Sequence, residues 1–427
     1  MRRFTYSDPS FQTAFAAFLD ERRGQPADVD AAAAEVLADV KARGLAAVLD
    51  FTRRFDKVEL TAETVRVTAD EIAAGVEACD PAVREAIAFA AKRIRAYHER
   101  QRPADQRWTD DEGVELGWRW GPLESVGVYV PGGRAAYPST VLMNCVPALV
   151  AGVDRIAMVT PPGKLQPAVL AAAHEAGVTE IWRIGGAQAV AALAYGAGPI
   201  QAVDKIVGPG NAFVTAAKRR LYGVVGLDAL AGPSEIVVVA DADNDPEWIA
   251  GDLLSQAEHD PAAQSILITD DEALADAVEA AVDRLLGTLS TGEDAALSWR
   301  DHGAVIIAPL SRSPELVDRI APEHVEFCTA DPDSLADQVR HAGAIFLGRH
   351  TPEALGDYVA GSNHVLPTSR AARFQSGLSL YDFLKRTSVI KASASAYSVL
   401  GRHTVALAEA EGLPAHALSA ALRLPKA

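Results

Sequence analysis

The chain has 427 residues, of which 49% are hydrophobic, and it carries a formal net charge of −17. This length exceeds what one hydrophobic core usually supports, so two to four domains are expected. The negative charge argues against a nucleic-acid partner, because binding phosphates requires a concentrated basic face.

Three widely spaced cysteines, Cys79, Cys145 and Cys328, cannot form a disulfide framework and are typical of a reducing cytosol. No CxxC pair is present, so a metal would need histidine, carboxylate or amide ligands. No apolar run approaches the roughly 18 residues that span a bilayer, and the first residues contain no apolar signal core. We therefore expect a cytoplasmic protein without a membrane segment.

Residues 1 to about 110 are predicted to be mainly helical. Apolar residues recur at helical spacing in residues 28–55, "DVDAAAAEVLADVKARGLAAVLDFTRRF", and again in residues 80–101. The second segment opens with Asp80-Pro81, a combination typical of a helix start.

From about residue 121 short β-branched runs alternate with helical segments. The first series contains the predicted strands "ESVGVYV", "DRIAMVT", "EIWRI" and "DKIV", and the second contains "EIVVVAD", "SILITDD", "AVIIAPL" and "GAIFLG". Such alternation predicts parallel sheets with right-handed crossovers. Two series predict two α/β domains, separated near "LAGPSE", and the chain from about 371 is predicted to be helical again.

Three strands of the first series end in glycine turns, "VPGG", "IGGAQA" and "VGPGN". Glycine lets backbone amides approach a ligand at the carboxyl edge of a sheet, and the helices that follow could bind a pyrophosphate. None of the turns is GxGxxG, so each alone could be an ordinary tight loop. Together with Gln188 and Asn211 just beyond the turns, they favour a ligand cleft.

Residues 246–260 are predicted to form a helix, because Asp245-Pro246 is a typical start and Pro261 a typical stop. Gln256 and His259 then lie side by side on its flank, where they could bind one ion. A site completed by Asp357 and His416 would be N₂O₂, which suits zinc better than calcium or magnesium. A merely solvated helix flank is the alternative.

Glu323 and His324 follow Pro322 in "APEHVE". Adjacent side chains can reach one substrate only where the chain bends, and the proline supplies a plausible bend. They would then form a pair of general bases. Spacing leaves surface or turn roles open for this pair and for His364 in "GSNHVLP" and Glu411 in "EGLPAH".

The chain resembles the histidinol dehydrogenase family over nearly its whole length, and nine stretches carry the resemblance. They are "VGVYVPGGRAAYPSTVLMNCVPALVAGV", "GGAQAVAALAYG", "KIVGPGNAFVTAAKR", "AGPSEIVVVAD", "DLLSQAEHDP", "APEHVE", "GDYVAGSNHVLPT", "GLSLYDFLKR" and "EGLPAHALSAALR". The resemblance implies an α/β fold with two incomplete Rossmann-like parallel-sheet domains and small helical N- and C-terminal segments, in a homodimer.

The expected division has four parts. Residues 1–24 form an N-terminal arm. A discontinuous first α/β domain, which carries the metal and catalytic motifs, comprises residues 25–120 and 234–370, and the NAD-binding second domain comprises residues 121–233. Residues 371–427 form a C-terminal helical tail, which in the family reaches the active site of the partner subunit. The sequence alone leaves open whether that tail acts within its own subunit.

The resemblance also implies L-histidinol as substrate, one Zn²⁺ per subunit and NAD⁺ as cofactor. It assigns catalysis to Glu323 and His324, and zinc ligation to Gln256, His259, Asp357 and His416. Substrate contacts would come from Ser234, Gln256, His259, His324, Asp357, Glu411, His416 and His364, and NAD contacts from Tyr129, Gln188 and Asn211.

Three rival functions are considered. A related dehydrogenase could oxidise a sulfonated diol, but it would need no "EGLPAH" tail that recognises imidazole. A zinc hydrolase would not need the glycine turns, and a non-catalytic binding protein would not need Glu323 and His324. Each feature is present, so the sequence favours histidinol oxidation.

Overall fold

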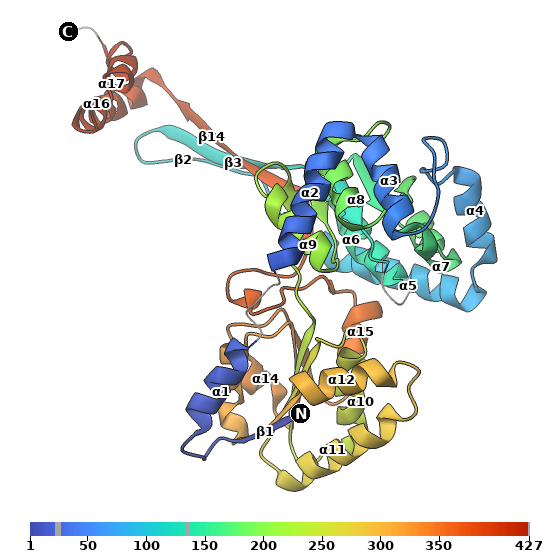
Figure 1. Cartoon of the computed structure of the whole chain (residues 1–427). Helices are drawn as coiled ribbons and strands as arrows, with labels where there is room; N and C mark the ends of the chain where they lie inside the picture. The colour runs from blue at the N-terminus through green and yellow to red at the C-terminus, as the bar shows by residue number, and fades with distance from the viewer. Residues whose placement is uncertain (22–26, 133–136, 426–427) are drawn as a thin grey trace.

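The computed structural model describes residues 1–21, 27–132 and 137–425, which form two α/β units and a projecting arm (Figure 1). Three predicted features lie outside the described residues. They are Gly133 of the first glycine turn, the boundary between residues 24 and 25, and the last two residues of the tail.

The first unit contains a six-stranded sheet in the order β1-β11-β10-β9-β12-β13, and all its pairings are parallel. The four predicted strands of the second series are β9, β10, β11 and β13 of this sheet, and β1 and β12 join them. The β-branched residues of β9, β10 and β11 are mostly buried, as is typical of parallel sheets. The strands are β1 Arg2–Thr5, β9 Glu235–Ala240, β10 Gln264–Thr269, β11 Ala304–Ile307, β12 His324–Cys328 and β13 Ala344–Leu347.

Helices cover both faces of this sheet. α10, α11 and α12 contribute to the core on one face, and α1 and α13 to the core on the other. The helices are α1 Phe11–Asp20, α10 Pro246–Ala257, α11 Glu272–Leu286, α12 Gly292–His302, α13 Ser313–Ile320, α14 Pro332–Ala336 and α15 Glu353–Tyr358. Residues 1–24 were expected to form an arm, but β1 pairs with β11 and the aromatic face of α1 is buried in the sheet's core.

The second unit contains a five-stranded parallel sheet in the order β6-β5-β4-β7-β8. Its strands are β4 Ser125–Tyr129, β5 Arg155–Val159, β6 Glu180–Trp182, β7 Lys205–Val207 and β8 Gly226–Leu227. Crossover helices follow four of the predicted strands: α6 Pro138–Ala151, α7 Pro167–Glu175, α8 Gly186–Tyr195 and α9 Ala212–Leu221. The prediction of two parallel-sheet units is confirmed.

The N-terminal helices pack on the second unit. They are α2 Ala27–Arg43, α3 Leu45–Phe55, α4 Ala69–Ala78 and α5 Pro81–Glu99. α2 packs on α8 and α9, and α5 packs on α6 and α7. The expected grouping of residues 25–120 with 234–370 does not match these contacts. An amphipathic helix shows which of its faces is buried, but it does not show which sheet covers that face.

The arm is an antiparallel sheet of β2 Gln106–Thr109, β3 Val114–Pro122 and β14 Leu384–Ala392, followed by α16 Ala394–Ala410 and α17 Pro414–Ala421. It extends away from both units and carries the C-terminal helices at its far end (Figure 1). The tail from residue 371 was expected to be helical, but residues 384–392 of it form the long strand β14. Most of β14 is exposed, so it lacks the buried apolar run that marked the other strands.

No helix in the described ranges is long and apolar enough to cross a bilayer. Cys79, Cys145 and Cys328 are all buried free thiols.

Candidate active site

A cavity of about 1650 Å³ is lined by residues from both α/β units. It brings together side chains that lie far apart in the sequence. Ten of the twelve predicted site residues line it: Tyr129, Gln188, Asn211, Ser234, Gln256, His259, Glu323, His324, Asp357 and His364. The site is therefore a cleft to which both α/β units contribute side chains.

Gln256 and His259 lie at the end of α10. The helix starts as predicted, because Asp245 accepts a hydrogen bond from the amide of Glu247 and Pro246 occupies the first turn. It ends at Ala257, so His259 lies in the turn just beyond it and not on the helix flank as predicted. The two side chains nevertheless meet, since Nε2 of Gln256 lies 3.2 Å from Nδ1 of His259.

Glu323 and His324 reach the same cavity because the chain bends before them. Ala321 has a positive φ of 52°, and Pro322 follows it. His324 then begins strand β12, which lies between β9 and the edge strand β13. Both side chains line the cavity, and Nδ1 of His324 lies 3.8 Å from Oε2 of Glu323. The predicted bend at Pro322 is confirmed.

The hydrogen bonds of His324 determine which ring nitrogen is free. Nδ1 lies 3.1 Å from the carbonyl oxygen of Glu235 and 3.1 Å from Oε1 of Gln256. Both atoms are acceptors, so Nδ1 carries the hydrogen. Nε2 is buried and has no hydrogen-bond partner within the described residues. In its neutral form, His324 therefore presents Nε2 as the basic atom.

Buried carboxylates surround this imidazole. Burial raises the pKa of Glu323 to about 8, partly opposed by His324. Burial lowers the pKa of His324, but Glu323, Glu353 and Asp357 together outweigh that effect and raise it. Burial also raises the pKa of Glu353, while His324 and the Ser255 hydroxyl oppose the change. Pairs of groups with shifted pKa values are typical of acid–base sites.

Asp357 and His364 complete this end of the cavity. Oδ1 of Asp357 lies 3.9 Å from Nε2 of His324. The backbone oxygen of Asp357 accepts a hydrogen bond of 3.0 Å from Nδ1 of His364. Burial lowers the pKa of His364, which favours the neutral ring. His364 can therefore offer a neutral Nε2 to the cavity.

The donor atoms suit a divalent transition metal. His324, Glu353 and Asp357 each place one ligand-type atom within 4.8 Å of the others. Gln256 and His259 adjoin this group through the contacts described above. Oε1 of Glu353, like Nε2 of His324, is buried without a hydrogen-bond partner in the described ranges. Imidazole and carboxylate donors clustered in this way are ligand types that zinc binds.

The glycine turns form the opposite wall of the cavity. The amide of Gly186 donates a hydrogen bond of 2.9 Å to the hydroxyl of Tyr129. Gly186 has a φ of 63°, and a Cβ there would lie 2.7 Å from Oε1 of Gln188. The turn therefore requires glycine at this position. It places Tyr129, Gln188 and the N-terminus of α8 on one surface.

The "VGPGN" turn is fixed by a buried ion pair. Nζ of Lys218 donates to Oδ1 of Asp228 and to the carbonyl oxygen of Gly208, while Oδ2 of Asp228 accepts from the amide of Gly208. Asn211 follows the turn and caps α9 through the amides of Phe213 and Val214. Both helix N-termini at this wall carry partial positive charge.

The family model for histidinol dehydrogenase matches residues 19–424. The chain belongs to the histidinol dehydrogenase family. A histidinol dehydrogenase from Caulobacter vibrioides is 80% identical over 425 residues, which cover 100% of this chain and 99% of the relative. One from Rhodospirillum rubrum is 59% identical over 99% of this chain and 98% of the relative. The crystal structure of histidinol dehydrogenase from Elizabethkingia anophelis has a TM-score of 0.93 at 34% identity, covering 99% of this chain and 98% of that chain.

Histidinol dehydrogenase is an NAD-dependent oxidoreductase of histidine biosynthesis. Two predicted site residues of this family member lie outside the cavity. Glu411 immediately follows α16 and His416 lies on α17, at the far end of the arm (Figure 1). The two helices pack on each other, and α16 also packs on β14. The structure of one chain thus assembles ten of the predicted positions and leaves these two apart.

Glu353 was not predicted from the sequence, although it lines the cavity beside the predicted catalytic histidine. Oε1 of Glu353 lies 3.8 Å from Nε2 of His324. Glu353 lies four residues before Asp357 on α15, so helical spacing could have flagged it as sharing the face of a candidate ligand. The Lys218–Asp228 pair gave no comparable signal, because its partners lie ten residues apart across a loop.

Proposed function

We propose that this family member catalyses the zinc-dependent oxidation of L-histidinol to L-histidine, the final step of histidine biosynthesis. Two NAD⁺ and one water are consumed and two NADH are formed, with histidinal as the intermediate. The observation that carries the proposal is the convergence of Glu323 and His324 with metal-ligand side chains in one cavity whose opposite wall contains the glycine turns.

Gln256, His259, Asp357 and His416 would hold one zinc ion per subunit. When bound, the ion supplies a Lewis acid that can anchor the imidazole and amino nitrogens of the substrate. The contact between Gln256 and His259, and the position of Asp357 in the same cavity, support this assignment for three of the four ligands. Manganese or cobalt could occupy such a donor set as well.

Substrate and cofactor would contact opposite walls of the cavity. We assign NAD⁺ to Tyr129, Gln188 and Asn211, beside the N-termini of α8 and α9, which suit a pyrophosphate. On the other wall the substrate would contact Ser234 and His364, together with Gln256, His259, His324 and Asp357. Glu411 and His416 would complete that contact set.

His324 is the base for the first oxidation. As a hydride leaves the carbinol carbon for NAD⁺, the hydroxyl proton moves to Nε2, which is the ring nitrogen without a hydrogen-bond partner in the described residues. The aldehyde then adds water. Glu323, whose carboxylate lies beside His324, takes the proton of that water, and a second hydride leaves the hydrate for another NAD⁺.

Glu411 and His416 would enter the site from a second copy of the chain, in a homodimer with shared active sites. Their position on the projecting arm supports this arrangement (Figure 1). Large apolar side chains are exposed along β14, α16 and α17, and an exposed apolar surface of this kind is typical of an interface. They are Ile390, Val399, Leu407, Leu413, Leu418 and Leu422.

The test is an assay of the purified protein with histidinol and NAD⁺, which follows the ultraviolet absorbance of NADH and quantifies histidine. We expect two NADH per histidine, no NADH with a sulfonated diol, loss of activity on chelation and recovery on adding zinc. NADH formation also excludes a hydrolase. Full activity after verified removal of all metal would contradict the zinc role.

A further inference from the structure

Glu353 has no role in the proposed reaction, although it is the carboxylate that lies nearest the free nitrogen of His324. Its residue exposure is 1%, and Oε1 has no hydrogen-bond partner within the described ranges. A buried polar atom without a partner destabilises the folded state, typically by about 1–3 kcal/mol. A buried polar atom of this kind calls for an explanation, and its position beside a general base points to a role in the reaction.

The orientation of His324 points to that role. Nδ1 donates to the Glu235 carbonyl and the Gln256 amide oxygen, so any proton that the ring accepts must bind to Nε2. Nε2 lies 3.8 Å from Oε1 of Glu353 and 3.9 Å from Oδ1 of Asp357. Asp357 is assigned to the zinc ion, which leaves Glu353 as the carboxylate available to the protonated ring.

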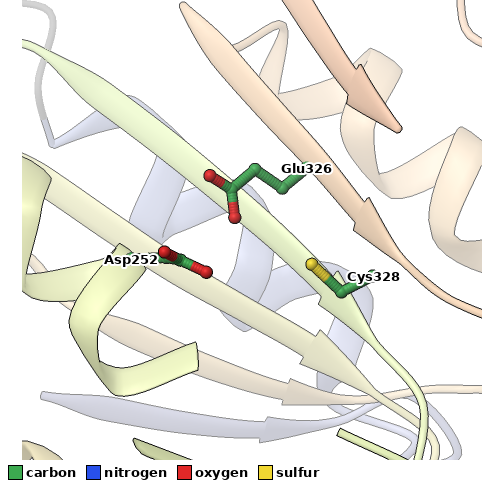
Figure 2. Close-up of side chains that lie close together, drawn as sticks. All are labelled: Asp252, Glu326 and Cys328. Carbon is green, nitrogen blue, oxygen red and sulfur yellow. The ribbon is translucent and has the colours of Figure 1, made fainter. Parts of the chain in front are cut away.

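Contacts on two sides fix Glu353 in place. Oε2 accepts a hydrogen bond of 2.9 Å from the hydroxyl of Ser255, and the Glu353 amide donates to Oε1 of Glu326. Glu326 lies two residues beyond His324 on β12, so both side chains point to the same face of the sheet. Below them, Asp252 of α10 and Cys328 lie close to Glu326 (Figure 2). Glu353 therefore rests on a buried polar layer that connects α10, β12 and α15.

We propose that Glu353 is a positioning residue that acts through His324. When His324 takes the hydroxyl proton, the Glu353 carboxylate, whose Oε1 lies 3.8 Å from Nε2, stabilises the charge of the imidazolium. The substrate C–H electron pair reduces NAD⁺, the O–H proton goes to Nε2, and the C–O bond becomes C=O. This proposal rests on the proposed function. The acid of a catalytic triad binds the ring nitrogen opposite the basic one, whereas Glu353 lies beside the nitrogen that takes the proton.

The test compares the zinc-loaded wild type with Glu353→Gln, which keeps the shape of the side chain and removes its charge. We expect kcat with histidinol to fall about 10- to 100-fold. We expect the histidinol dissociation constant and the zinc content to stay at wild-type values. The matched control is Glu315→Gln, which changes an exposed carboxylate on α13 and should leave kcat unchanged.

A second measurement separates positioning from general support of the fold. If Glu353 acts through His324, then adding Glu353→Gln to His324→Gln should change kcat by less than about twofold, because coupled residues are not additive. The proposal would be overturned if the effects of the two substitutions on kcat multiplied, or if kcat were unchanged in Glu353→Gln. Loss of zinc in Glu353→Gln, or a weaker histidinol affinity with a normal kcat, would also overturn it. A wild type that does not oxidise histidinol would overturn the proposed function instead.

Ser255→Ala provides an independent variant if Glu353→Gln does not fold. It removes the hydrogen bond to Oε2 and leaves both reacting side chains intact. The loss of one such bond should lower kcat about three- to tenfold. An unchanged kcat in this variant would also overturn the positioning role.

Discussion

Oε1 of Gln256 accepts a hydrogen bond of 3.1 Å from Nδ1 of His324. This contact joins a proposed zinc ligand to the proposed base. It also fixes the neutral tautomer of His324, because the Glu235 carbonyl beside Nδ1 is a second acceptor. The position of the metal ligands and the availability of Nε2 are therefore linked through one amide.

His324→Gln should slow oxidation of histidinol by roughly 10²- to 10⁴-fold, because the base for the hydroxyl proton is lost. Glu323→Gln should slow oxidation of supplied histidinal more than that of histidinol. Single-turnover assays with each substrate separate the two steps. Two variants that both stay within about threefold of wild type, well below the effect expected of a general base, would contradict the assignment.

The rate of histidinal oxidation should depend on pH through Glu323. Burial raises its pKa to about 8, and it can take a proton only when ionised. We therefore expect kcat/KM for histidinal to increase with pH and to level off above about pH 8. In Glu323→Gln this increase should disappear. A wild-type rate that is already constant from pH 5 upward would show that another group limits the step.

Lys218→Met should destabilise the protein and weaken NAD⁺ binding. The side chains of Lys218 and Asp228 are only 3% and 4% exposed, and breaking a buried pair leaves one unpaired charge, at a cost of about 3–5 kcal/mol. The double variant Lys218→Met/Asp228→Asn should recover part of the free energy of unfolding, as measured in urea. A double variant no more stable than Lys218→Met would contradict the ion-pair account.

Asp252→Asn should stabilise the protein at pH 8 and have little effect at pH 4. Burial raises the pKa of Asp252 to about 6, and that of Glu326 well above its usual range. A raised carboxyl pKa means that ionisation disfavours folding. The penalty is therefore absent below the unfolded pKa of about 4 and complete above about 6.

At pH 8, Asp252→Asn should increase the free energy of unfolding by roughly 2–3 kcal/mol, because each unit of pKa shift corresponds to about 1.36 kcal/mol. Denaturant unfolding of both proteins at the two pH values measures it. The neighbouring variant Asp245→Asn, which retains a helix cap, is the control. A gain of the same size at pH 4 would indicate a cause other than ionisation.

The sequence predicted the parts of the fold that depend on local pattern. Strands β9, β10 and β11 are buried, mainly apolar runs, and α5 and α10 begin at Asp-Pro pairs that cap them as expected. It did not predict which sheet the N-terminal helices cover. It also missed β14, because an exposed strand pairs through its backbone and needs no apolar pattern.

In the candidate site, too, residues in local motifs could be predicted from the sequence, whereas contacts between distant elements could not. Gln256, Glu323 and His324 could be selected from short motifs, since each lies beside a proline or a helix end. Glu353 could not be connected with His324, because the two residues belong to different elements and meet only when α15 packs near β12. The distance between His416 and the cavity likewise depends on the arm, whose projection no local pattern encodes.

Mixing two inactive subunits tests most directly whether two copies of the chain build each site. Co-expressed His416→Ala and His259→Ala subunits form heterodimers in which one site combines an intact cavity with an intact arm from the partner subunit. The account predicts that isolated heterodimers show about half the wild-type activity per dimer, while both homodimers stay inactive. Heterodimers as inactive as the homodimers would contradict it.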